Sequence, residues 1–109
     1  MDVLLVILAA ALAILIYILT LAPTVSFWDS GEYITCAYVM GVPHPPGVPL
    51  FVLMGRFFTL LFFFIPAVAV RVNLMCMLAG VASVALVTRL LQRWGKRVGF
   101  APALYRPLS

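Results

Sequence analysis

The sequence predicts an all-α integral membrane protein with two transmembrane helices, joined by an extracytoplasmic loop that contains two short interfacial helices. Three observations support this fold class. Hydrophobic residues make up 66% of the chain and charged residues only 9%, against about 25% charged in an average soluble domain. One uncharged apolar run opens the chain, and a second lies between Arg71 and Arg89. Polar and proline-rich residues separate the two runs.

Residues 1–21 form the first predicted span. Residues 3–21 contain no charge, proline or glycine, and at about 1.5 Å per residue they match the ~30 Å hydrocarbon core. A cleaved signal peptide would begin with a basic region and end at a small-x-small site. The start here is Met1-Asp2, and the apolar run is long. We therefore expect a retained signal anchor.

Residues 72–88 form the second span, which is slightly short, so we expect the flanking arginines to snorkel. Residues 89–109 form a basic tail, which the positive-inside rule places in the cytoplasm. Both termini are then cytoplasmic, and residues 22–71 face the periplasm or exterior, with the cytoplasmic membrane as the location in a bacterium. The basic residues beside the second span are Arg89, Arg93, Lys96 and Arg97.

The net charge of +4 comes largely from that tail. It is explained by topology and by nearby anionic lipid. No aromatic interleaving accompanies the basic residues, so the lipid bilayer is an expected partner and nucleic acid is not.

Two carboxylates begin the structured part of the loop. Asp29 and Glu32 have the spacing of a capping box, with Asp at the N-cap position. The predicted helix covers residues 30–40 and stops at Gly41, with a proline shortly after. Carboxylates beside a membrane span are also a site hypothesis by default, so capping and function both remain open for this pair.

A stiff proline segment follows at residues 42–49. Each proline restricts its own φ and disfavours the α region before it, so Pro45, Pro46 and Gly47 are expected to be structural and to hold His44 in an extended segment. Pro49 suits the first turn of a further helix, which we place at residues 50–64, broken near Pro66.

This middle helix has a rival interpretation as a third crossing. A crossing would put Arg56 deep in lipid, at a cost of about 2.5–3.5 kcal/mol on insertion scales. It would also invert the orientation of everything that follows. A helix lying in the outer interface avoids both consequences, and we favour it.

Five short motifs follow one another in and beside the loop. They are Leu21-Ala22-Pro23-Thr24-Val25, Trp28-Asp29-Ser30-Gly31-Glu32, Gly41-Val42-Pro43-His44-Pro45-Pro46-Gly47, Leu53-Met54-Gly55-Arg56 and Arg71-Val72-Asn73-Leu74. In this order they resemble the opening of the membrane proteins grouped as domain of unknown function 2723, over about residues 18–91. That family belongs with the protein O-mannosyltransferase relatives in the GT-C glycosyltransferase class.

The resemblance implies a specific chemistry. GT-C enzymes take a sugar from a polyprenyl-phosphate carrier and pass it to an acceptor, here a protein or a glycan, with inversion at the anomeric carbon. Asp29 matches the acid of their first extracytoplasmic loop, which implies a general base for the acceptor hydroxyl. The His-Pro-Pro block would shape the floor of the acceptor site. Relatives with adjacent Asp and Glu differ from this chain, where Ser30 and Gly31 intervene, so the role of Glu32 stays open.

Other polar residues are candidates for substrate binding or for structural roles. Glu32, His44 and Arg56 are possible substrate-binding residues. Arg56 is expected either to snorkel, to bind the carrier phosphate or to pair with Asp29. Arg71 and Asn73 are expected to anchor the top of the second span, or else to orient the loop.

No resident metal or cofactor is expected. One histidine and two separated carboxylates make a poor metal site, although together with a sugar phosphate they can hold a divalent cation weakly. Cys36 and Cys76 are expected to be free, buried thiols.

A GT-C core needs more membrane helices than this chain supplies. We therefore expect an N-terminal fragment or truncated member that is incomplete and inactive alone, completed by the missing helices or a partner subunit. The alternative function is a small non-enzymatic membrane subunit that packs against a larger partner. A transporter fragment is disfavoured because transport sites lie near the membrane midplane.

Overall fold

The structure is a computed structural model that describes residues 2–99. Over these residues it is all-helical, as predicted. The helices are α1 (Asp2–Thr20), α2 (Ser30–Val39), α3 (Pro49–Leu61) and α4 (Val68–Arg97). Two of them, α1 and α4, are long and apolar enough to cross a membrane. The last ten residues of the expected tail, 100–109, lie outside the described residues.

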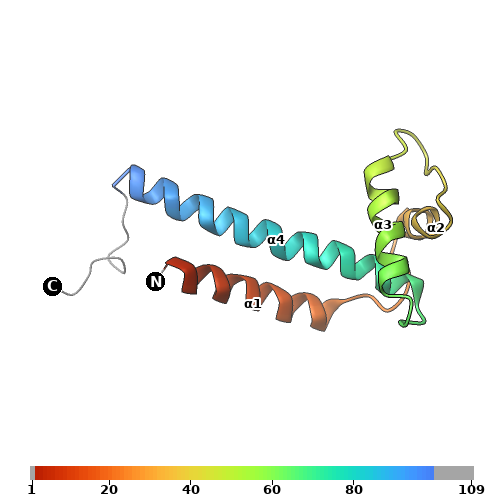
Figure 1. Cartoon of the computed structure of the whole chain (residues 1–109), viewed down its shortest axis with the longest axis horizontal. Coiled ribbons are helices and arrows are strands. Elements are labelled where there is room, and N and C mark those ends of the chain that lie inside the picture. The colour runs from red at the N-terminus through yellow and green to blue at the C-terminus, as the bar shows by residue number, and fades with distance from the viewer. Residues whose placement is uncertain (1, 100–109) are drawn as a thin grey trace.

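Helices α1 and α4 form an antiparallel hairpin with the described ends of the chain at one end (Figure 1). Polar contacts tie the hairpin at both ends. Near the chain ends, the Gln92 amide donates to the Asp2 carbonyl at 2.9 Å, and Lys96 forms an ion pair with the Asp2 carboxylate. At the far end, the Asn73 amide donates to the Ala22 carbonyl at 2.9 Å. Polar contacts near both ends of the two long helices therefore help to fix their register.

Helix α4 is longer than the predicted span of residues 72–88. It begins at Val68 and continues through the basic residues to Arg97, so its 30 residues rise about 45 Å. The sequence predicts that the second span begins after Arg71, because a charged residue usually marks the end of a membrane span. The Arg71 side chain instead turns back onto the preceding segment, and the helix passes through this position. The expected basic tail is thus helical over residues 89–97.

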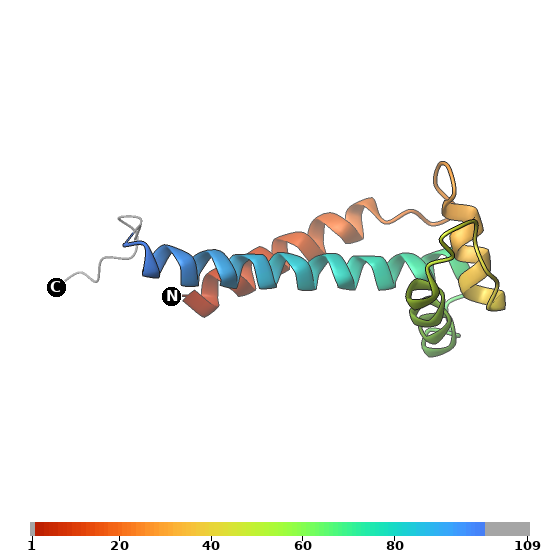
Figure 2. The same cartoon turned by 90° about the horizontal axis from the view of Figure 1, so that it is seen from above.

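Helices α2 and α3 lie across the far end of this hairpin (Figures 1 and 2). They approach each other closely at Gly55 and Ala37. Ala37 is fully buried, and a Cβ atom added at Gly55 would lie 2.6 Å from the Ala37 Cβ. Because carbon atoms in contact are normally about 3.5–4.0 Å apart, this crossing accepts only glycine at position 55 without a shift.

A small apolar core joins these two helices to the start of α4. It consists of Ile34, Ala37, Val72 and Met75, with partly buried Phe51, Phe58, Val68 and Ala69 packed around it. Burial of these side chains, at roughly 25 cal/mol per Å² of apolar surface, holds α2 in place against α4. The loop between the long helices is therefore a packed unit rather than a flexible linker.

The helix ends differ modestly from expectation. Helix α2 ends at Val39, with Met40 in the left-handed conformation (φ 60°), whereas the sequence placed the stop at Gly41. Helix α3 ends at Leu61 rather than at residue 64, because residues 62–65 turn back with Ile65 N–H donating to the Phe62 carbonyl at 2.9 Å.

The length and direction of α3 bear on the rival third crossing. Its 13 residues rise about 20 Å, less than the ~30 Å hydrocarbon core, and it lies across the hairpin (Figure 1). This geometry favours the interfacial interpretation. The sidedness of the membrane stays a prediction.

Candidate functional site

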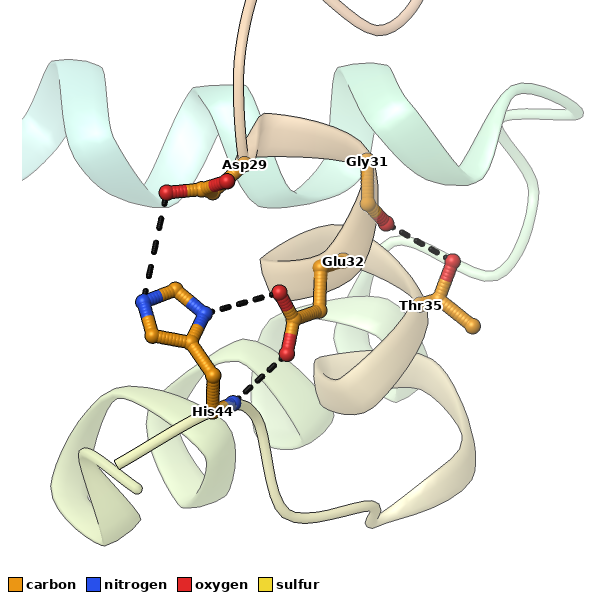
Figure 3. A network of polar contacts seen from close by, with 5 residues as sticks. All are labelled: Asp29, Gly31, Glu32, Thr35 and His44. Atoms are coloured by element: carbon orange, nitrogen blue, oxygen red, sulfur yellow. Dashed lines mark hydrogen bonds and ion pairs between the residues drawn. The ribbon is translucent and has the colours of Figure 1, made fainter. Parts of the chain in front are cut away.

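Three polar side chains from separate points of the chain meet at the far end of the hairpin. Asp29 immediately precedes α2, Glu32 lies in the first turn of α2, and His44 belongs to the loop between α2 and α3 (Figure 3). All three are exposed. The structure thus brings together the predicted catalytic residue and two of the three possible substrate-binding residues.

Glu32 holds His44 through two hydrogen bonds. The backbone N–H of His44 donates to Glu32 Oε1 at 2.6 Å, and the ring Nδ1 lies 2.8 Å from Oε2 (Figure 3). An ionised carboxylate only accepts hydrogen bonds, so Nδ1 carries the proton. The neutral ring then has its free lone pair on Nε2, which faces Asp29 Oδ2 at 3.9 Å.

These contacts overturn the predicted capping box. Asp29 occupies the N-cap position, but its side chain makes no capping hydrogen bond. Glu32 does not reach back to the N-cap, because both of its oxygens accept hydrogen bonds from His44. The carboxylate of Asp29 is consequently free to face the imidazole and solvent.

The Glu32–His44 contact shifts both titrations. The hydrogen bonds from the His44 ring and backbone lower the pKa of Glu32. The same ring hydrogen bond, followed by the charge of Glu32, raises the pKa of His44. Each partner therefore favours the charged form of the other, as expected for an opposite charge in hydrogen-bonding contact.

The proline segment turns rather than running straight. Gly47 N–H donates to the His44 carbonyl at 3.1 Å, and the Pro45–Pro46 peptide bond is cis. Gly47 has φ 86° and Val48 φ 32°, so the chain reverses before Pro49 starts α3. The expectation of an extended segment is wrong because restricting φ at each proline still leaves a turn accessible. Pro49 does occupy the first turn of α3, as predicted.

Tyr33 supports the imidazole and was not singled out from the sequence. Its ring meets the His44 ring edge-on at 5.7 Å between centroids and the Phe51 ring at 5.6 Å. Such edge-to-face pairs are favourable at this distance. The available signal was its position next to Glu32 in a short helix, which does not distinguish it from an ordinary apolar contact.

Arg56 is not part of the cluster. Its Nη1 donates to the Tyr38 carbonyl at 2.5 Å, and its guanidinium lies 5.6 Å from the Tyr38 ring centroid. It therefore ties α3 to the end of α2. Of the three alternatives considered for Arg56, pairing with Asp29 is not made, and snorkelling and phosphate binding stay predictions.

The contacts of Arg71 and Asn73 fit both roles expected for them, anchoring the top of the second span and orienting the loop, and the choice between these roles stays a prediction. Arg71 donates to three carbonyls, of Ile65 at 2.6 Å and of Thr59 and Phe63 at 3.1 Å. It therefore satisfies carbonyls that the end of α3 leaves without helical partners. Asn73 ties α4 to residue 22, just after α1.

A pocket of about 410 Å³ lies beside the cluster. Its wall is mainly apolar, and it includes the buried Ser30 Oγ, which has no hydrogen-bond partner among the described residues. Ser30 follows Asp29 directly, and Tyr33 contacts His44, so the pocket adjoins the polar groups. Its lining residues are Ser30, Tyr33, Ile34, Val48, Phe51, Val72, Asn73 and Cys76.

Asp29, Glu32 and His44 offer few free ligand atoms for a metal ion. Atoms of Asp29, Glu32 and His44 lie within 4.8 Å of one another, but both Glu32 oxygens are engaged by His44. The groups left are one imidazole nitrogen and one carboxylate, whereas Mg²⁺ and Ca²⁺ take six or more ligands, mostly oxygen. We assign no metal, and the weakly held divalent cation stays a prediction.

The cysteines differ from expectation in exposure. Both are free, but Cys36 is only half-buried and Cys76 is exposed.

Comparison with known proteins places the chain in the protein O-mannosyltransferase-like class of membrane proteins. The profile of the family described as "Protein O-mannosyl-transferase TMEM260 N-terminal domain" matches residues 29–103, about two thirds of the chain. The chain belongs to this family. The match begins at Asp29, so it includes the whole polar cluster together with α2, α3 and α4.

Two curated relatives agree with this assignment. Protein O-mannosyl-transferase TMEM260 of Mus musculus is 46% identical over 72 residues, which is 66% of this chain and 10% of the relative. Protein O-mannosyl-transferase tmem260 of Dictyostelium discoideum is 49% identical over 45 residues, or 41% of this chain and 6% of the relative. The chain thus spans a tenth or less of the length of these relatives. No solved structure matches it.

Proposed function

We propose that this segment forms the N-terminal part of a GT-C membrane glycosyltransferase, of the family grouped as domain of unknown function 2723. In this proposal the complete enzyme transfers mannose from a polyprenyl-phosphate carrier to an acceptor hydroxyl. Mannose is proposed because the relatives are protein O-mannosyl-transferases. The observation that carries the proposal is the exposed Asp29 carboxylate, beside a structured His44 and a pocket, at one end of a hairpin of apolar helices.

Asp29 acts as the general base. The acceptor O–H bond breaks as the proton moves to the carboxylate, and the acceptor oxygen attacks the anomeric carbon. The bond between that carbon and the phosphate oxygen breaks from the opposite face, and the polyprenyl phosphate leaves. A positioned base of this kind commonly contributes 10²- to 10⁴-fold. The Asp29 side chain is 61% exposed and makes no capping bond, so an acceptor has access to it.

The loop residues build the floor of the acceptor site. The turn at His44–Gly47 is held against α2 by Glu32 and against Tyr33 by ring contact. The apolar pocket suits the first carbons of a prenyl chain or an apolar acceptor side chain. Arg56 is committed to Tyr38, so the charge for the carrier phosphate comes from other parts of the enzyme.

In this proposal the long helices anchor the site at the membrane surface. The start of α1 and the end of α4 are cytoplasmic, and α2 and α3 lie at the outer face, in the periplasm or its equivalent. The basic residues at the end of α4 support this orientation through the positive-inside rule.

The test uses a full-length relative carrying this segment in reconstituted membranes. Mannose transfer to a hydroxyl acceptor is measured with polyprenyl-phosphate mannose and, separately, with nucleotide-linked mannose. Transfer from the lipid-linked donor alone is expected. Transfer from only the nucleotide donor contradicts the donor assignment. Full activity of Asp29→Asn would show that Asp29 is not the general base.

A further inference from the structure

The His44 imidazole is fixed on one edge and open on the other. Glu32 holds the backbone N–H and Nδ1 of His44, at 2.6 and 2.8 Å. The opposite ring nitrogen, Nε2, faces Asp29 Oδ2 at 3.9 Å (Figure 3). The ring is also braced by the edge-on contact with Tyr33. A surface histidine would not normally be held by so many contacts, because an exposed side chain loses rotamer freedom when it is ordered.

The order of these groups matches a proton path. With Nδ1–H donating to Glu32, the neutral ring has a free lone pair at Nε2, aimed at Asp29. In model peptides imidazoles titrate roughly 2.5 units above carboxylates, so a proton on a carboxyl beside a neutral imidazole moves to the ring. The separation exceeds a hydrogen bond by about 1 Å. The exposed Asp29 side chain, without a capping bond, closes that gap by rotating.

We propose that Glu32, His44 and Asp29 form a proton relay in which Glu32 is a positioning residue and His44 receives the proton that Asp29 takes from the acceptor hydroxyl. The inference rests on the proposed function of Asp29. After sugar transfer the proton is on Asp29 Oδ2. That O–H bond breaks as the Nε2–H bond forms, which leaves a carboxylate and an imidazolium. The imidazolium then gives the proton to water, and no oxidant or reductant is involved.

Among the described residues, few ionisable groups face His44. Asp29 faces the ring from the turn before α2, and Glu32 and the Tyr33 phenol face it from α2. Arg56, the ionisable side chain of α3, is bonded to the Tyr38 carbonyl. The raised pKa of His44 agrees with this balance, because Glu32 is its main cause.

The test is the pH dependence of transfer by a full-length relative carrying this segment. The relay needs a neutral ring, so transfer should rise with pH through the pKa of His44. Glu32→Gln keeps a hydrogen-bond acceptor and removes the charge that raises this pKa, so the midpoint of the rise should move to lower pH. His44→Gln should abolish this limb of the profile and lower transfer by about 10²-fold or more.

A matched control separates positioning from general damage to α2. Thr35, whose hydroxyl donates to the Gly31 carbonyl at 2.8 Å on the same helix (Figure 3), is replaced by valine. Thr35→Val should leave the midpoint where it is. A Glu32→Gln midpoint that matches the parent and Thr35→Val, or transfer that falls as pH rises through the limb, overturns the relay.

Different experimental outcomes refute the relay and the proposed function. If Asp29→Asn keeps near-normal turnover, the general base is wrong, and the relay falls with it. If Asp29→Asn is inactive while Glu32→Gln shows an unmoved midpoint, only the relay is refuted.

Discussion

The crossing of α2 and α3 gives the sharpest prediction about stability. A methyl group at position 55 would lie 2.6 Å from the Ala37 Cβ, which overlaps normal contact by about 1 Å. Overpacking of this kind costs about 1–3 kcal/mol, and alanine regains about 1 kcal/mol of helix propensity over glycine. Gly55→Ala should therefore be neutral to about 2 kcal/mol destabilising, despite the better helix former.

The reciprocal substitution tests the cause. Ala37→Gly removes a buried methyl and lowers helix propensity, for about 2 kcal/mol in total. In the double variant the new methyl at position 55 has only the backbone Cα of residue 37 near it, at 3.7 Å, which is ordinary contact. The double variant should thus be more stable than the sum of the two single changes by about 1–3 kcal/mol, which is the coupling energy of a double-mutant cycle.

The assay is the alkylation rate of Cys36, which is half-buried on α2, in micelles and in a Cys76→Ala background. Local opening exposes the thiol, and 1–2 kcal/mol changes the open population about 5- to 30-fold. Gly80→Ala is the control, since its methyl meets the end of the Tyr17 ring, which can swing aside. Additive effects of the two changes in the double variant would refute the close approach.

Three further predictions concern other contacts. The single histidine of the chain, His44, should titrate by NMR with a midpoint above 6.5, and this midpoint should fall in Glu32→Gln. The pKa of Glu32 is lowered from 4.5 and that of His44 is raised from 6.5, so the pair stabilises the fold fully between those two pH values. This stabilisation should decrease as pH falls through the folded pKa of Glu32 and as pH rises through the folded pKa of His44. Arg71→Lys should lower stability by about 1–3 kcal/mol in thermal melts, since one ammonium cannot reach all three carbonyls that Arg71 contacts, and a drop no larger than that of Arg89→Lys would contradict this. A cysteine probe at the exposed Val42, but not one at Gly99, should react with an impermeant reagent from outside, and labelling at Gly99 would show that α3 crosses the membrane.

The long helices could be predicted from the sequence because a long uncharged apolar run marks where a membrane-spanning helix lies. The loop helices also followed from local signals, namely Asp29 before α2 and Pro49 at the start of α3. These signals act over a few residues, so a sequence pattern is enough to detect them. Boundaries were less accurate where Arg71 and the basic end of α4 continued a helix that charge had been expected to end.

The contacts of the site could be predicted only in part. Asp29, Glu32 and His44 were identified as candidates, but the capping box was wrong because Glu32 bonds a partner twelve residues away. Arg56 likewise reaches a carbonyl on the neighbouring helix. Such pairings depend on how α2 and α3 pack, and no local pattern encodes that arrangement.

The most direct test of the central claim is a single-turnover measurement on Asp29→Asn in a full-length relative carrying this segment. Asparagine keeps the size of the side chain but is no base near neutral pH, so the rate of sugar transfer from a bound polyprenyl-phosphate donor should fall by about 10²- to 10⁴-fold. Expression, membrane insertion and donor affinity should stay normal. A transfer rate within a few-fold of the parent would show that Asp29 is not the general base.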